Sequence, residues 1–227
     1  MASPVRPWHE TGQGDFFSER KAFDRVRVIT VIYDSYVSSH RIAAMSITDD
    51  HLPAGASPGA RAFIGLGSNL GDAAANLDAA RSALSRLPEV DILRFSPVYR
   101  TEPQGMREQP FFFNQVAEVR CSPALRPQAL LETLQAVESA LGRDRKGAVR
   151  FGPRVIDLDL LLFGNTRINN PRLTLPHPRM VERAFVLLPL ADLVPELILP
   201  QGISVRGALS ALKYTLQGDA IFQGSTE

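Results

Sequence analysis

The sequence predicts an α+β fold, in which helices pack on a β-sheet. Two stretches carry apolar residues at helical spacing, and four shorter apolar stretches are typical of strands. In chain order they alternate as β-α-β-β-α-β between residues 62 and 164. The 227 residues suit one sizeable domain with an appendage, or two small domains.

The first strand and the first helix are predicted within residues 62–88. The apolar run AFIGLG (62–67) predicts a short strand that leads into GSNLGD. The following segment, DAAANLDAARSALSRL, predicts a helix that Pro88 ends. The apolar positions of this helix are Leu77, Ala80, Leu84 and Leu87.

GLGSNLG (65–71) connects this strand to this helix, where a phosphate-binding loop would also lie. Its glycines are spaced G-x-G-x-x-x-G rather than G-x-G-x-x-G, and no G-K-[ST] follows. A Rossmann or P-loop site is therefore not predicted. We expect instead a turn in which Ser68 and Asn69 make local hydrogen bonds.

Two further strands are predicted from DILRFSPVYRT (91–101) and FFFNQVAEVR (111–120). The segment between them is long and polar for a hairpin, which indicates a functional role. A second helix lies within SPALRPQALLETLQAVESALGR, and Gly142 suits the position after its end. The apolar stripe of this helix consists of Leu130, Leu131, Leu134, Val137 and Leu141.

The last core strand is predicted in GPRVIDLDLLLFG (152–164). Because side chains alternate along a strand, one face is expected to enter the core with Ile156, Leu158, Leu160 and Leu162. The other face is expected to carry Val155, Asp157, Asp159, Leu161 and Phe163. The complete order of elements is that of a ferredoxin-like core, here expected in three layers, αβα.

The ends of the chain differ in composition from this core. Residues 1–60 are rich in proline, glycine and polar residues and predict a poorly ordered N-terminal extension and linker. Residues 61–227 are expected to form the functional domain. Its C-terminal extension begins near residue 171 and includes a helix around ERAFVLLPLADL.

Composition restricts the function classes. With 25 basic and 24 acidic residues the net charge is +1, which favours neither a nucleic-acid nor a membrane-surface protein. The single cysteine, Cys121, cannot form an internal disulfide and is interpreted as a buried thiol. No signal peptide or long apolar segment is evident, so a cytoplasmic location is expected.

Asp157 and Asp159 are unusual in an otherwise apolar strand. Two like charges on one half-buried face repel, so both stay ionised only beside a cation. Their hard oxygen ligands suit Mg²⁺, which shares its remaining positions with water and phosphates. The alternative is a pair of salt bridges to arginines, for which Arg150 and Arg154 are available.

A run of cations immediately before these aspartates favours a polyphosphate ligand. Arginines bind phosphate oxygens in a bidentate manner, and a metal can bridge those oxygens. The run consists of Arg143, Arg145, Lys146, Arg150 and Arg154.

Two other positions allow functional and structural interpretations. Glu138 lies on the apolar stripe of the second helix, with Gln135 nearby, and pairing with a loop arginine would explain it without any ligand. His177 lies in the rigid sequence P-H-P before Arg179 and Arg183, where a phosphate contact and a structural role are equally compatible with the pattern.

Several motifs occur together in one order. They are F-I-G-L-G-S-N-L-G-D, S-P-V-Y-R-T-E-P, Q-P-x-F-x-N, G-P-R-x-I-D-L-D-L-L-L-F-G and L-P-H-P-R-x-x-E-R-x-F-V-L-x-P-L. From residue 62 to about 200 the chain thereby resembles the 6-hydroxymethyl-7,8-dihydropterin pyrophosphokinase family of folate biosynthesis. The resemblance implies transfer of pyrophosphate from ATP to the pterin hydroxymethyl group, with AMP as the second product.

The resemblance also implies roles for individual residues. Asp157 and Asp159 match ligands of two Mg²⁺ ions, and Arg143 and Arg154 are expected to support catalysis with them. The positions that match ATP-binding residues are Gln135, Glu138, Arg145, Lys146, Arg150, Arg172, Thr174, His177 and Arg183. Those that match the pterin pocket are Thr101, Pro103, Phe112, Asn114, Phe151 and Phe185.

Two other function classes remain possible from the residues alone. A non-catalytic ferredoxin-like module could use the aspartates only as salt-bridge acceptors. An RNA-binding sheet is disfavoured by the neutral net charge and by the lack of an aromatic strand motif of the RNP type. The expected partners are therefore ATP and the pterin, with no nucleic acid and no membrane, and the expected state is a monomer.

Overall fold

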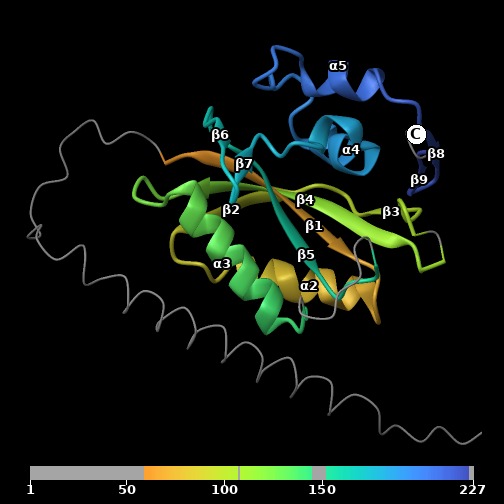
Figure 1. The fold of residues 1–227 in the computed structure, drawn as a ribbon, viewed down its shortest axis with the longest axis horizontal. Coiled ribbons are helices and arrows are strands. Elements are labelled where there is room, and N and C mark those ends of the chain that lie inside the picture. Colours follow the sequence, from red (N-terminus) through yellow and green to blue (C-terminus); the bar gives the residue numbers. More distant parts are fainter. Residues whose placement is uncertain (1–58, 107, 145–151, 225–227) are drawn as a thin grey trace, which may run out of the picture.

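The computed structural model describes residues 59–106, 108–144 and 152–224. The predicted N-terminal extension, residues 1–60, lies outside this part of the chain except for its last two residues. Figure 1 shows a central sheet with helices on both faces, a mixed α/β fold. Among the described residues, no helix combines the length and the apolar character needed to cross a bilayer.

The core elements follow the predicted order. They are β1 (Arg61–Ser68), α2 (Ala73–Leu84), β2 (Val90–Phe95), β3 (Tyr99–Thr101), β4 (Phe112–Cys121), α3 (Pro127–Ala140) and β5 (Asp157–Phe163). Local signals set the helix ends: the Asp72 side chain accepts a hydrogen bond from the Ala75 amide at 3.0 Å, and Pro127 opens α3. After α3, Gly142 adopts a φ of 97°, as predicted for the residue that follows a helix.

The sheet has the strand order β5-β1-β4-β3-β9-β8, in which β8 (Thr215–Gln217) and β9 (Ala220–Phe222) come from the C-terminal region, and β2 also pairs with β4. All neighbouring strands of the core are antiparallel. The single strand predicted over 91–101 is divided into β2 and β3, because Pro97 cannot donate to a ladder. Between β2 and β3, Ser96 keeps the chain hydrogen-bonded to β4. Its hydroxyl accepts from the Val116 amide at 3.0 Å, and its own amide donates to the Val116 carbonyl at 2.9 Å.

The predicted alternation of side chains between the two faces of β5 is confirmed for the first residues of the strand and wrong for the last two. Phe63 pairs with Leu162 and Ile64 pairs with Leu160, so Leu161 is an extra residue. This bulge reverses the faces beyond it, and Leu162 and Phe163 therefore lie on the faces opposite to those predicted. Asp157 and Asp159 precede the bulge and share one face.

Each face of the sheet has its own apolar core. On one face, Leu77 of α2 and Leu130 of α3 pack against β1, β4 and β5. On the other face the core is formed by Leu187 in α4 (Ala184–Leu193) and Val205 in α5 (Val205–Ser210). The predicted helix around ERAFVLLPLADL is thus confirmed as α4, and it covers the face that carries the two aspartates.

The C-terminal region contains more structure than its sequence pattern indicates. The short strands β6 (Ile168–Asn169) and β7 (Thr174–Leu175) form a hairpin, and a 3-10 helix η2 (Met180–Glu182) precedes α4. A second hairpin, β8 (Thr215–Gln217) and β9 (Ala220–Phe222), adds to the central sheet. β9 runs parallel to β3, with Thr101 opposite Ile221.

Because β1 lies in the middle of the sheet, truncation of a buried side chain in this strand should strongly lower the free energy of unfolding. Ile64 is fully buried between the sheet and its helices, whereas Ile198 is 61% exposed. We expect Ile64→Ala to lower the free energy of unfolding by about 2–5 kcal/mol. Ile198→Ala should change it by less than about 0.5 kcal/mol. Equilibrium denaturation in urea measures both, and equal effects would contradict this assignment of the core.

Candidate active site

A cavity of about 560 Å³ opens on the face of the sheet that α4 covers. It is lined by residues from β1, β3, β4, β5, α3 and the start of α4. Among the predicted metal-binding, catalytic and ATP-binding positions, those that line it are Gln135, Arg143, Arg154, Asp157, Asp159, His177 and Arg183. Among the predicted pterin positions they are Thr101, Phe112, Asn114 and Phe185. Predicted residues as far apart in the chain as Thr101 and Phe185 thus meet in one cavity.

Other predicted positions are not brought to the cavity wall. Glu138, Pro103, Arg172 and Thr174 do not line it. Arg145, Lys146, Arg150 and Phe151 lie outside the described residues.

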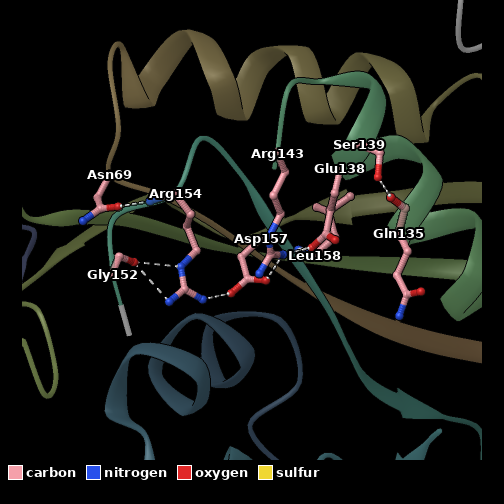
Figure 2. Close-up of polar contacts among 9 residues, drawn as sticks. All are labelled: Asn69, Gln135, Glu138, Ser139, Arg143, Gly152, Arg154, Asp157 and Leu158. Atoms are coloured by element: carbon pink, nitrogen blue, oxygen red, sulfur yellow. Dashed lines mark hydrogen bonds and ion pairs between the residues drawn. The ribbon is translucent and has the colours of Figure 1, made fainter. Parts of the chain in front are cut away.

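Asp157 is held by two guanidinium groups. Arg143 and Arg154 each form an ion pair with its carboxylate, one on each oxygen (Figure 2). Burial alone would raise the pKa of Asp157, but the two arginines outweigh it and hold the pKa below its usual range. Asp157 is therefore ionised and compensated. The salt-bridge interpretation named Arg150 and Arg154: the pair with Arg154 is present, the second partner is Arg143, and Arg150 lies outside the described residues.

Asp159 is in a different electrostatic environment. Within the described part of the chain it makes no hydrogen bond or ion pair, and Arg183 is its foremost attractive charge. Burial, followed by the charge of Asp157, raises the pKa of Asp159 to about 6. A carboxylate in this position would be stabilised by a cation.

Glu138 helps to hold the Arg143 side chain beside Asp157. Its side chain is fully buried, accepts a hydrogen bond from the Leu158 amide at 2.7 Å and pairs with Arg143. The pairing with a loop arginine, which was the structural alternative for this residue, is thus what the fold contains. Glu138 ties α3 to β5 and directs Arg143 toward Asp157, while Gln135 lies one turn earlier on α3 (Figure 2).

Asn69 positions the backbone of Arg154. The prediction that the Asn69 side chain makes local hydrogen bonds is wrong, because this side chain accepts from the Arg154 amide at 2.8 Å. It also donates to Gln109 and to the Pro110 carbonyl, at 3.0 and 3.1 Å. Asn69 is 2% exposed and joins the segment before β4 to the segment before β5. Sequence reasoning missed this role because both partners are distant in the chain.

The side chains predicted to bind the pterin lie near the site's arginines. The Asn114 amide donates to the Thr101 hydroxyl at 2.7 Å, which orients both polar groups in the cavity wall. The Phe112 ring lies 5.7 Å from the Arg154 guanidinium, and the Phe185 ring lies 5.3 Å from that of Arg183. Aromatic faces and directional polar groups together suit a flat, polar-edged ring.

His177 is neutral at physiological pH in this environment. Burial, followed by the charges of Arg183 and Arg179, lowers the pKa of His177 to about 4. Its Nδ1 accepts a hydrogen bond from the Arg179 amide at 3.3 Å, which assigns the proton to Nε2. His177 can therefore donate one hydrogen bond into the cavity without adding charge.

The geometry defines a class of site: cations around two half-buried carboxylates, next to aromatic side chains and directional polar groups. Such a site suits a phosphate-bearing ligand together with a flat ring. Residues 63–195 match the model of the family described as 7,8-dihydro-6-hydroxymethylpterin-pyrophosphokinase (HPPK). The chain belongs to this family.

Curated relatives agree with this membership. The 2-amino-4-hydroxy-6-hydroxymethyldihydropteridine pyrophosphokinase of Pseudomonas aeruginosa is 45% identical over 154 residues, which cover 68% of this chain and 93% of the relative. The enzyme of the same name from Methylorubrum extorquens is 45% identical over 152 residues, 67% of this chain and 93% of the relative.

Solved structures resemble the fold at low sequence identity. A crystal structure of Plasmodium falciparum HPPK-DHPS matches with a TM-score of 0.53 and 15% identity, over 68% of this chain and 46% of that longer chain. This chain thus spans about half the length of the matched structure, and the similarity concerns the fold.

The environment of Asp159 predicts a pH-dependent stability in metal-free protein. Its usual pKa of 3.8 is raised to about 6 by folding, so the folded state binds the proton more tightly. The stability that this proton confers is present below about pH 4 and lost as the pH rises through 6. The difference in unfolding free energy between Asp159→Asn and the wild type should therefore shift in favour of the variant by on the order of 2 kcal/mol when the pH is raised from 4 to 7.

Denaturation in the presence of EDTA at both pH values measures this change. Asp91→Asn, at an exposed position of β2, serves as the matched control for loss of a carboxylate. A stability difference between Asp159→Asn and the wild type that is the same at pH 4 and pH 7 would contradict the description of this site.

Proposed function

We propose that this chain is a Mg²⁺-dependent pterin pyrophosphokinase, which transfers pyrophosphate from ATP to 6-hydroxymethyl-7,8-dihydropterin in folate biosynthesis. The observation that carries the proposal is the unequal compensation of two carboxylates in one cavity. Asp157 is paired with arginines, whereas Asp159 has no ion pair among the described residues. Family membership gives the reaction, and the cavity supplies the groups that this reaction needs.

In this reaction the pterin hydroxymethyl oxygen attacks the β-phosphorus of ATP, and the hydroxyl proton is released to water. The bond from that phosphorus to the oxygen that bridges it to the α-phosphorus breaks, and AMP leaves with this oxygen. The chain's task is to align the two substrates and to stabilise charge on the transferred group. Arg143, Arg154 and Arg183 are the described cations suited to this task, and neutral His177 adds a hydrogen-bond donor.

Asp157 and Asp159 are the proposed ligands of two Mg²⁺ ions. When bound, the metal would neutralise phosphate charge and polarise the transferred group. The donor set supports this proposal, since Mg²⁺ is bound by one or two carboxylates together with substrate phosphates and water. The described residues contain no cluster of three acidic, histidine or cysteine side chains that would form an all-protein metal cage.

ATP is proposed to bind along α3 and the segment before α4, through Gln135, His177 and Arg183. The pterin is proposed to bind at the end with Thr101, Asn114 and the rings of Phe112 and Phe185. For Glu138 we propose a supporting role through Arg143, because it is fully buried. The positions that we further propose for ATP and pterin from family membership are Arg145, Lys146, Arg150, Arg172, Thr174, Pro103 and Phe151.

We also propose that the core is ferredoxin-like and that residues 61–227 form the catalytic unit. The first point is supported by the antiparallel strand order β5-β1-β4-β3, with β2 beside β4. The second is supported by the first described strand, which begins at Arg61. A monomer in the cytoplasm remains our proposal, in keeping with the buried single thiol of Cys121.

Formation of AMP tests the proposed function. Purified protein with ATP, Mg²⁺ and the hydroxymethyl dihydropterin should release one AMP for each pterin diphosphate formed, and EDTA should stop the reaction. The competing proposal is a non-catalytic binding module, favoured by the arginine pairs on Asp157. If the protein is such a binding module, it should bind the ligands without forming any AMP.

Substitution of the two aspartates separates chemistry from folding. We expect Asp157→Ala and Asp159→Asn each to lower kcat by roughly a thousandfold or more, because both remove a proposed metal ligand. Asp159→Asn should leave the metal-free protein as stable or more stable, since it removes an uncompensated buried charge. Asp157→Ala should destabilise it, because Arg143 and Arg154 lose a partner. Asp91→Ala is the matched control, and wild-type turnover in either site variant would refute the metal site.

Removal of the N-terminal extension tests the domain assignment. A chain that begins at Ala60 retains β1 and the hydrogen bond from the Cys121 amide to the Ala60 carbonyl, 2.8 Å long. We expect its kcat and both KM values to stay within about twofold of those of the full chain, because every described residue of the cavity is kept. A loss of activity with an unchanged melting temperature would assign a catalytic role to residues 1–59.

A further inference from the structure

The C-terminal hairpin reaches the active site from outside the part of the chain that defines the family. The family model ends at residue 195, whereas β9 ends at Phe222 and Gln223 follows it. Gln223 is 7% exposed and lines the cavity. It lies two residues beyond Ile221, which pairs with Thr101 at the proposed pterin end.

The side chain of Gln223 binds the backbone on both sides of Arg183. Its Oε1 accepts a hydrogen bond from the Ala184 amide at 2.7 Å, and its Nε2 donates to the Glu182 carbonyl at 2.8 Å. Its Oε1 also accepts from the side chain of Gln104 at 3.3 Å. One amide group therefore joins β9, the start of α4 and the segment that follows β3.

This contact supplies what the local sequence lacks. Arg183 is the N-cap residue of α4, and its side chain makes no capping hydrogen bond. A helix start needs acceptors for its first amides, and residues such as serine or aspartate usually provide them locally. Here Gln223 provides one from 39 positions away. Arg183 could not provide it, because a guanidinium has no acceptor, and its guanidinium lies 5.3 Å from the centroid of the Phe185 ring.

Further contacts hold the hairpin in register with β3. The Arg100 amide donates to the Asp219 carbonyl at 2.9 Å, and their side chains form an ion pair. On the other side, the rings of Phe111 and Phe222 meet edge to face at 5.9 Å between centroids. Both contacts precede Gln223 in the chain and hold β9 in place directly before it.

We propose that Gln223 is a positioning residue of the active site, which fixes the turn that carries Arg183 and Phe185 and so sets the affinity for the flat-ring substrate. This inference rests on the proposed function for the identity of that substrate. It adds a C-terminal element, beyond the family-defining region, to the machinery of this chain.

The test compares three substitutions. Gln223→Met keeps the size of the side chain but removes both backbone hydrogen bonds. Gln223→Glu keeps the acceptor for the Ala184 amide and loses the donor to the Glu182 carbonyl. Gln217→Ala, at an exposed position of β8 in the same hairpin, is the matched control.

The expected result is a change that is specific for one substrate. Gln223→Met should raise the KM for the hydroxymethyl dihydropterin by about tenfold, the effect of losing one to two buried hydrogen bonds. The KM for ATP should rise by less than about threefold, because Arg183 lies on the turn that Gln223 holds, whereas the other described residues proposed to bind ATP, Gln135 and His177, lie outside it. Gln223→Glu should lie between Gln223→Met and the wild type, and Gln217→Ala should match the wild type.

Two results would overturn the inference. One is an unchanged KM for the pterin in Gln223→Met when the wild type is active. The other is an equal rise of the KM values for the pterin and for ATP, in proportion to the fall in melting temperature of each variant. A purely structural role of Gln223 predicts that result.

Hydrogen exchange separates this inference from the proposed function. The Ala184 amide should exchange at least about tenfold faster in Gln223→Met than in the wild type, without any ligand. Unchanged exchange would refute the positioning role. Absence of AMP formation by the wild type would refute the proposed function alone, since the exchange experiment does not depend on turnover.

Discussion

Asp157 and Asp159 lie on one face of β5, a strand that is otherwise apolar, and the charge of Asp157 opposes the ionisation of Asp159. Only one of these two carboxylates is paired with arginine side chains among the described residues. Arg143 and Arg154 compensate Asp157, whereas Asp159 keeps a raised pKa of about 6. The rest of the site is arranged around this asymmetry, because a buried uncompensated carboxylate is costly unless a cation accompanies it.

The arginines that compensate Asp157 are themselves held by groups from other elements. Glu138 of α3 orients Arg143 and accepts from the amide of Leu158, directly after Asp157. Asn69, after β1, holds the backbone of Arg154. The charges of the site are thereby fixed before any ligand binds, which is the condition under which they stabilise a developing negative charge most effectively.

The opposite wall of the cavity depends on α4 and on the hairpin after it. α4 covers the face of the sheet that bears the aspartates, and its first residues carry Arg183 and Phe185. Gln223 supplies the backbone hydrogen bonds that this helix start lacks locally. The region that defines the family and the region that completes the cavity wall are therefore not the same.

The sequence by itself determined the order of the core elements, both helices and the shared face of Asp157 and Asp159, because these depend on the local periods of strand and helix. Its motifs also identified many of the residues that line the cavity, but not Gln223. Only the tertiary structure decided the bulge at Leu161, which moved Leu162 and Phe163 to opposite faces, since a bulge arises from pairing with β1. The long-range roles of Asn69, Glu138 and Gln223 were likewise decided there. Each is a hydrogen bond between segments distant in the chain, and such partners leave no periodic signal in the sequence.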